Sequence, residues 1–167
     1  MRTFSLALLT AGVIALAGGP AMADLPAADQ AFLLRTASGS MTEIQLGQIA
    51  QQKATSSDVR QLARRMVADH TAASQDLQAI ADEQGLTLPD QPERMAQAMT
   101  QRLRGTTGSD FDQAYVQQVV RYHQQDLAAF RREVRSGQDP DLKAFAQKYL
   151  LMIQQHLQLA QSLVQPN

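Results

Sequence analysis

Residues 59–80, VRQLARRMVADHTAASQDLQAI, decide the fold of this 167-residue chain. Apolar side chains and one histidine recur in it three and four residues apart, at Val59, Leu62, Met66, His70, Ala73, Leu77 and Ile80. Positions with this spacing lie on one face of an α-helix. The stretch therefore predicts a helix over 58–84 that buries this face and carries a histidine at its centre.

Turn and capping residues divide the rest of the chain into further helices. We expect long helices over 27–54, 109–136 and 140–165, with Gly137 closing the second of these and Asp139-Pro140 opening the last. Helix-favouring Ala, Gln, Leu and Arg dominate, and β-branched residues are sparse. The predicted fold class is all-α.

The lengths of the connections predict the topology. Few residues join the first long helix to the second, and the third to the fourth, so each pair should form an antiparallel hairpin. Residues 86–108 are too many for a simple turn and contain a short predicted helix over 92–104. We therefore expect a ferritin-like four-helix bundle, in which a long crossover with a short helix joins two antiparallel hairpins.

Residues 1–23 have the pattern of a signal peptide. Arg2 precedes an apolar run over 6–17, and Ala21-Met22-Ala23 matches a small-x-small cleavage site. The apolar run is too short to span a bilayer comfortably, which argues against a retained anchor. We expect cleavage after Ala23, export to the bacterial periplasm, and a single secreted domain over 24–167.

The composition excludes several classes of function. Without residues 1–23 the chain has 14 basic and 16 acidic residues, a net charge of −2, and it has no cysteine. No basic patch with aromatic residues points to nucleic acid as a partner. Thiolate catalysis and zinc–thiolate sites are excluded. The mature chain has no candidate transmembrane segment. The sequence identifies no protein partner and is compatible with a homo-oligomer.

The three histidines of the chain fall near the middle of three different predicted helices. They are His70, His123 and His156, and Glu43 lies near the middle of the remaining helix. At 1.5 Å of rise per residue, their offsets from the helix centres amount to about 5 Å or less. All four lie on apolar stripes, so they should meet at one level inside the bundle whichever way the helices run.

Four polar groups at one buried level indicate either a metal site or a buried polar cluster. Imidazole and carboxylate ligands suit Fe, Cu, Zn or Mn, so the first interpretation is a site for one divalent or redox metal ion. Asp126, three residues after His123, is close enough to orient its imidazole or to bind the ion. Met66 and Met152, each four residues before a histidine, are weaker candidates, because methionine at helical spacing is usually core. In the second interpretation, the histidines bond one another, Glu43, Asp126 and the tyrosines without an ion.

The spacing argues against a dinuclear site. Di-iron bundles use two Glu-x-x-His pairs and two further glutamates. Val67 and Ile153 stand three residues before His70 and His156, and the chain contains no Glu-x-x-His. We therefore expect one ion at most.

Several ordered segments share a pattern with one known family. They are 41–47 (MTEIQLG), 66–70 (MVADH), 85–89 (GLTLP), 111–115 (FDQAY) and 141–146 (DLKAFA), together with Phe32, Phe130, His123 and His156-Leu157. In these segments, over about residues 29–163, the chain resembles the domain-of-unknown-function 4142 family. The resemblance implies an exported, mostly bacterial, ferritin-like protein from a family without an established biochemical role.

The family pattern is matched at the candidate site. The matching residues are Glu43, Asp69, His70, His123 and His156. The resemblance thereby adds Asp69 to the residues expected beside the ion. The chain departs from the pattern at Tyr122, where the family usually has an acidic residue, and at Leu151, where it usually has proline. Neither departure removes a candidate ligand.

Two functions follow from these patterns. The first is an exported metal-binding protein that acts in metal handling or stress protection. The alternative is a metal-free periplasmic module for envelope stress or protein interaction. No nucleophile elbow, phosphate loop or paired acid motif occurs, so an enzyme is the less favoured interpretation.

Overall fold

The computed structural model describes residues 25–164, so the predicted signal peptide lies outside the described residues. The helices are α1 (Ala27–Lys53), α2 (Ser57–Glu83), α3 (Arg94–Arg104), α4 (Gly108–Ser136) and α5 (Pro140–Leu163). No strand occurs within this range. The all-α prediction is confirmed, and each predicted helix boundary falls within two residues of the observed one. None of the five helices combines the length and the apolar character that crossing a membrane requires.

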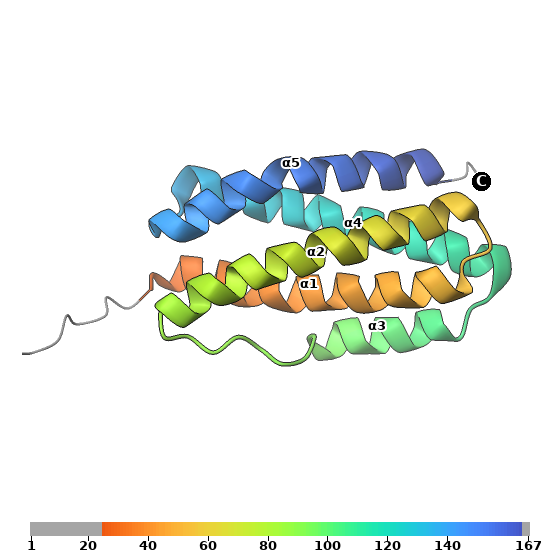
Figure 1. Cartoon of the computed structure of the whole chain (residues 1–167), viewed down its shortest axis with the longest axis horizontal. Helices are drawn as coiled ribbons and strands as arrows, with labels where there is room; N and C mark the ends of the chain where they lie inside the picture. Colours follow the sequence, from red (N-terminus) through yellow and green to blue (C-terminus); the bar gives the residue numbers. More distant parts are fainter. Residues whose placement is uncertain (1–24, 165–167) are drawn as a thin grey trace, which may run out of the picture.

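The four long helices lie side by side, and α3 packs mainly on α1 (Figure 1). Helices α1 and α5 run in one direction, while α2 and α4 run in the other (Figure 1). The closest pairings are α1 with α2 and α4 with α5, and the two pairs meet through α2–α5 and α1–α4 contacts. The connection through α3 returns the chain to the end of the bundle where α2 began. Helix α4 therefore starts there and runs parallel to α2.

Local signals end the helices where the sequence predicts. Gly85 has a φ of 65°, and the Leu86 amide donates a hydrogen bond to the Ala81 carbonyl at 2.8 Å, which closes α2. Asp139 opens α5, because its carboxylate accepts a hydrogen bond from the Leu142 amide at 2.8 Å. These short-range contacts depend only on neighbouring residues, which is why the sequence predicts them well.

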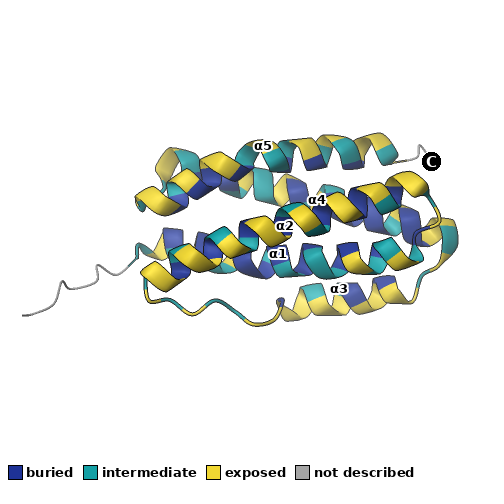
Figure 2. Ribbon diagram, in the orientation of Figure 1, coloured by how far each residue is buried: buried dark blue, intermediate teal, exposed yellow. Residues whose placement is uncertain are grey.

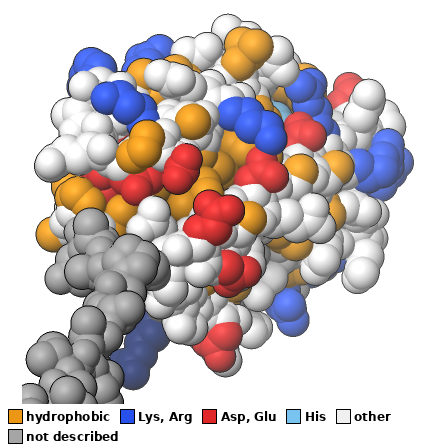
Figure 3. Space-filling view, turned by 60° about the vertical axis from the view of Figure 1, so that its left-hand side comes forward, with side chains coloured by type: hydrophobic (Ala, Val, Ile, Leu, Met, Phe, Trp, Pro, Cys, Tyr) orange, Lys and Arg blue, Asp and Glu red, His pale blue; other side chains and the backbone are white. Residues whose placement is uncertain are grey.

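Two buried aspartates connect each hairpin to the turn of the other. Asp112, in α4, accepts hydrogen bonds from the amides of Thr55 and Ser56 at 3.0 and 2.7 Å, in the α1–α2 turn. Asp29, in α1, accepts from the amides of residues 138 and 139 at 2.8 and 2.6 Å, in the α4–α5 turn. Figure 3 brings the end with the α4–α5 turn forward, where acidic and apolar side chains share the surface. These contacts join distant parts of the chain, and no spacing rule predicts them.

Two apolar clusters fill the bundle, one toward each end. Figure 2 shows buried residues on each of the long helices. The first cluster includes Leu46, Leu62, Met66, Phe111, Tyr115 and Val119. The second includes Phe32, Leu33, Leu77, Phe130, Leu142 and Phe145. Gly47 permits close approach of α1 and α2, because a Cβ there would lie 2.7 Å from Cγ2 of Val67. The level predicted to hold the histidines lies between these two clusters.

Candidate metal centre

Three histidines from three helices converge at the middle of the bundle. His70 of α2, His123 of α4 and His156 of α5 each offer a ring nitrogen, and these nitrogens lie within 4.8 Å of one another. Nε2 of His123 is 3.4 Å from Nε2 of His70 and 3.2 Å from Nδ1 of His156. The residues are 4%, 0% and 0% exposed, respectively. The expected convergence of the three imidazoles therefore occurs.

The outward nitrogens of two rings have partners that can only accept a hydrogen bond. Nδ1 of His123 lies 3.0 Å from the carbonyl oxygen of Val119. Nε2 of His156 lies 2.8 Å from Oδ2 of Asp69. A carbonyl or a carboxylate oxygen has no proton to give, so each outward nitrogen carries the single proton of its neutral ring. The inward nitrogens, Nε2 of His123 and Nδ1 of His156, are therefore bare lone pairs.

These two lone pairs face each other across 3.2 Å. His70 can donate a proton from Nε2 to His123, but that proton does not lie between His123 and His156. Protonating either ring would place a proton between His123 and His156. Burial opposes this, because it lowers the pKa of His123 to about 3 and also lowers the pKa of His70 and of His156. With the three rings neutral, the inward side of the triad offers lone pairs, and a group of three histidines so close together could hold a metal ion.

Asp69 connects the triad to the surface. Its side chain is 34% exposed, and its Oδ2 also lies 3.3 Å from Nε of Arg65, one helical turn earlier on α2. Metal-binding histidines commonly donate a hydrogen bond to a carboxylate, which fixes the ring orientation. The sequence predicts Asp69 near the ion only through the family resemblance, and the structure brings it directly against His156.

Glu43 lies on the other side of His123. Its Oε1 is 3.6 Å from Nδ1 of His123, the nitrogen that points away from the other two rings. The residue is 1% exposed, and within residues 25–164 neither carboxylate oxygen has a hydrogen-bond partner. Burial, and secondly the charge of Asp126, raises the pKa of Glu43 well above its ordinary value. Glu43 shares the level of the triad, as expected, and its role as a ligand stays a prediction.

No hydrogen bond joins Asp126 to His123 among the described residues, and the role of Asp126 as a ligand stays a prediction. The outward nitrogen of His123 bonds to the carbonyl of Val119 instead. Asp126 lines a cavity of about 10 Å³ together with His70. Burial raises its pKa to about 7, and the charge of Arg35 acts in the opposite direction. His123 can bond to the carbonyl of Val119 because a histidine side chain inside a helix reaches the residue four positions earlier.

The two methionines also differ in their surroundings. Met66 is fully buried in the apolar cluster near the α1–α2 turn, which is the core role weighed against ligation. Met152 is partly buried and lines the same small cavity as His70. Neither position tests whether a thioether binds an ion.

Sequence reasoning missed three polar contacts between side chains of α2 and α5 or within α2. Arg65 pairs with Asp69, and the i,i+4 spacing on one helix could have revealed it. Tyr149 donates a hydrogen bond to Asp76 at 2.6 Å, and Lys148 contacts the same carboxylate oxygen at 2.6 Å. That second contact set joins α5 to α2, so no pattern along a single helix indicates it.

Comparisons with solved structures support the fold. The crystal structure of a DUF305 fragment from Deinococcus radiodurans matches with a TM-score of 0.75 at 11% identity, covering 85% of this chain and 98% of that one. A DUF305 protein from Streptomyces coelicolor, described as a candidate secreted protein, matches with a TM-score of 0.70 at 16% identity, covering 81% and 89%. At such low identity the likeness concerns the fold alone. No curated protein matches the chain.

One family model also matches. It is described as a domain of unknown function, DUF4142, and it matches residues 15–163. The match spans almost the whole chain, including every residue of the histidine triad, and it confirms the resemblance seen in the sequence segments. The chain belongs to the DUF4142 family.

Proposed function

We propose that this protein is an exported, ferritin-like bundle that binds one metal ion through His70, His123 and His156, and that it serves metal handling or stress protection. The observation that carries the proposal is the pair of inward lone pairs on His123 and His156, 3.2 Å apart. Their outward nitrogens are held as donors by Val119 and Asp69. A bound cation would relieve the repulsion between the lone pairs.

The ligand chemistry limits the identity of the ion to a few metals. Neutral imidazoles suit Zn, Cu, Fe and Mn, and the chain has no cysteine to select a softer ion. The three histidines would hold the ion, and Asp69 would fix the ring of His156. Glu43 and Met152 are the further candidate ligands, and the absence of Glu-x-x-His favours one ion over two.

The ferritin-like and export parts of the proposal have separate support. The long connection through α3, which makes α2 parallel to α4, is the connectivity of ferritin-like bundles (Figure 1). The signal-peptide pattern of residues 1–23 supports export to the bacterial periplasm. The described secreted character of the Streptomyces coelicolor neighbour is in accord with it.

Metal analysis of protein purified from the periplasm tests the proposal. We expect about one ion per chain in the wild type, and a loss of both bound metal and thermal stability in His70→Ala and His123→Ala. Gln124→Ala, at an exposed position next to His123, is the matched control and should keep its metal. The proposal would be contradicted if the wild-type protein is purified without metal and its melting temperature does not change when Cu, Zn, Fe or Mn is added.

The metal-free interaction module is the second candidate. Met95 on α3 is 84% exposed and Leu151 on α5 is 60% exposed, so each is an apolar side chain that a protein partner would cover. Single exposed apolar side chains are common on protein surfaces, so a binding experiment has to decide. If the histidine variants lose stability while the wild type carries no metal, this candidate is favoured. Pull-down from envelope extract with wild type and Met95→Gln tests it, and the absence of a reproducible partner would count against it.

A further inference from the structure

We infer that a metal ion reaches the histidine triad through the groove between α2 and α5, past Asp69, Met152 and Tyr149. The inference rests on the proposed function, because it concerns how the proposed site is loaded and unloaded. It assigns to the groove a role in the rate of metal exchange.

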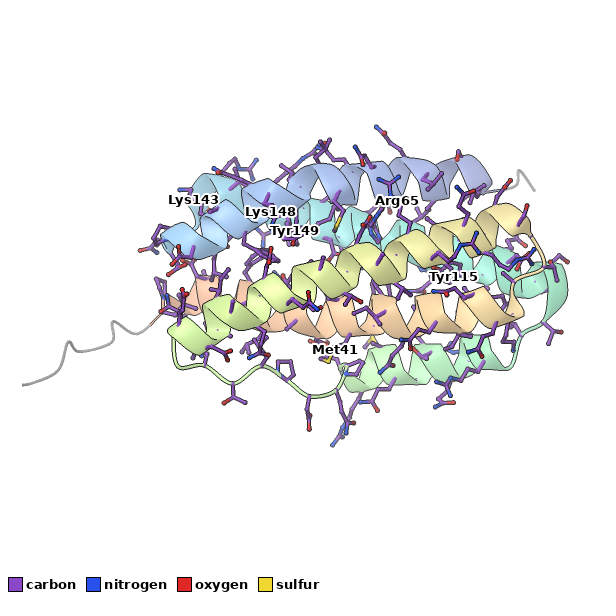
Figure 4. The ribbon with its side chains drawn as sticks, in the orientation of Figure 1. Met41, Arg65, Tyr115, Lys143, Lys148 and Tyr149 are labelled. Atoms are coloured by element: carbon purple, nitrogen blue, oxygen red, sulfur yellow. The ribbon has the colours of Figure 1, made fainter. Side chains whose placement is uncertain are left out.

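The groove is an open cavity of about 360 Å³ on the surface of the bundle. Its lining includes Arg65, Asp69, Lys148, Tyr149, Met152 and Gln155. Figure 4 places Arg65, Lys148 and Tyr149 along the seam where α5 meets α2. The lining therefore combines charged and polar groups with the thioether of Met152.

Two contacts connect this groove with the triad. Asp69 lines the groove, and its Oδ2 bonds to Nε2 of His156 at 2.8 Å. The cavity of about 10 Å³ beside His70 shares Tyr149 and Met152 with the groove. Two of the three imidazoles are thus separated from an open cavity by a single layer of side chains.

Two other directions of approach are closed among the described residues. Along the bundle axis, the two apolar clusters lie on either side of the histidine level. On the α1–α4 side, Glu43 is 1% exposed and Tyr115 is 0% exposed. An ion crossing an apolar cluster would lose its hydration without gaining ligands, which is costly. The α2–α5 seam instead offers the partly exposed carboxylate of Asp69.

The charges on the seam predict how the rate can be changed. Asp69 is the donor group that an entering ion would meet, and Met152 lines both the groove and the small cavity beside His70. Arg65 competes for Asp69, since its Nε lies 3.3 Å from Oδ2 of that carboxylate. Lys148 is paired with Asp76 at 2.6 Å, so its charge is offset. Removing the Arg65 charge should therefore speed the entry of a cation.

Stopped-flow association of Zn²⁺ with the metal-free full chain tests the route, after its equilibrium affinity has been measured. The first pair of variants is Arg65→Gln and Arg64→Gln, which remove the same charge from neighbouring exposed positions of α2. At low ionic strength we expect Arg65→Gln to associate roughly fivefold faster than Arg64→Gln, because only Arg65 lines the groove. Added salt should reduce that difference.

The second pair is Met152→Ala and Met99→Ala, which shorten two partly buried methionines on different helices. Met152→Ala should speed both association and chelator-driven release, because it shortens a side chain that lines both the groove and the small cavity beside His70. Met99→Ala on α3 should resemble the wild type. Equal rates within each pair would overturn the inferred route. A wild type that binds no Zn²⁺, Cu²⁺, Fe²⁺ or Mn²⁺ at equilibrium would instead overturn the proposed function, so the two failures are distinguishable.

Discussion

The two seams that flank the triad each bring a carboxylate close to an imidazole, with opposite results. On the α2–α5 seam, the partly exposed Asp69 bonds to His156 at 2.8 Å and to Arg65 at 3.3 Å. On the α1–α4 seam, the buried Glu43 lies 3.6 Å from His123, and within residues 25–164 neither of its oxygens accepts a hydrogen bond. The functional group is the same, but its partners and its access to water differ.

The difference shows that closeness to a histidine does not by itself define a carboxylate's role. The outward N–H of His123 already donates to the carbonyl of Val119, so it has no proton for Glu43. The outward N–H of His156 has no backbone acceptor of this kind, and Asp69 takes that place. The available donor, more than the distance, decides which carboxylate fixes a ring and which stays unpartnered.

The largest expected difference between the seams is in metal affinity. Asp69→Asn should weaken binding by roughly 10–100-fold, because a neutral amide holds the His156 ring less firmly than a carboxylate does. Glu43→Gln should change the affinity by much less. Isothermal titration of both variants measures this, with Asp76→Asn as a control from the same helix as Asp69. If Glu43→Gln loses more metal affinity than Asp69→Asn, the two carboxylates do not differ as proposed, and Glu43 is favoured as a ligand.

A second expected difference concerns the pH dependence of stability. The pKa of Glu43 is raised above its ordinary value of 4.5, so the folded protein keeps a proton that the unfolded chain has already lost. The resulting stability is present below pH 4.5 and is lost as the pH rises through the raised pKa. The wild type should therefore lose stability relative to Glu43→Gln as the pH rises.

Melting temperatures of wild type and Glu43→Gln, measured from below pH 4.5 upward, test the prediction. The histidines, whose pKa values are lowered from 6.5, destabilise the folded state as the pH falls below that value. That effect is common to both proteins and largely cancels in their difference. A difference in melting temperature that stays constant with pH would show that Glu43 is not the titrating group.

The smallest expected difference is between two tyrosines, one on each seam. Tyr149→Phe removes the hydrogen bond to Asp76 and should cost about 1 kcal/mol. Tyr115→Phe removes a buried hydroxyl that has no partner among the described residues, so it should be neutral or stabilising by up to about 1 kcal/mol. Urea denaturation of both variants measures these changes. A clear loss of stability in Tyr115→Phe would reveal a partner for that hydroxyl, and both tyrosine hydroxyls would then be hydrogen-bonded.

The parts of the fold that were predictable depend on local rules. The helix boundaries follow from caps such as Asp139 and Gly85, which act on residues within one turn. The convergence of the histidines follows from helical periodicity and rise, because these place a residue on a face and at a level. The buried contacts of Asp29 and Asp112 were not predictable, since each bonds to the turn of the opposite hairpin.

The sequence by itself determined that three imidazoles and Glu43 meet at one level of an all-helical bundle. Periodicity of 3.6 residues and a rise of 1.5 Å locate a side chain to within about 5 Å, and that is enough to bring the rings together. Only the tertiary structure decided which nitrogens point inward, that Val119 and Asp69 hold the outward ones, and that Asp126 lines a small cavity with His70. Those outcomes depend on helix rotation and side-chain rotamers, because a hydrogen bond tolerates only tenths of an ångström in length.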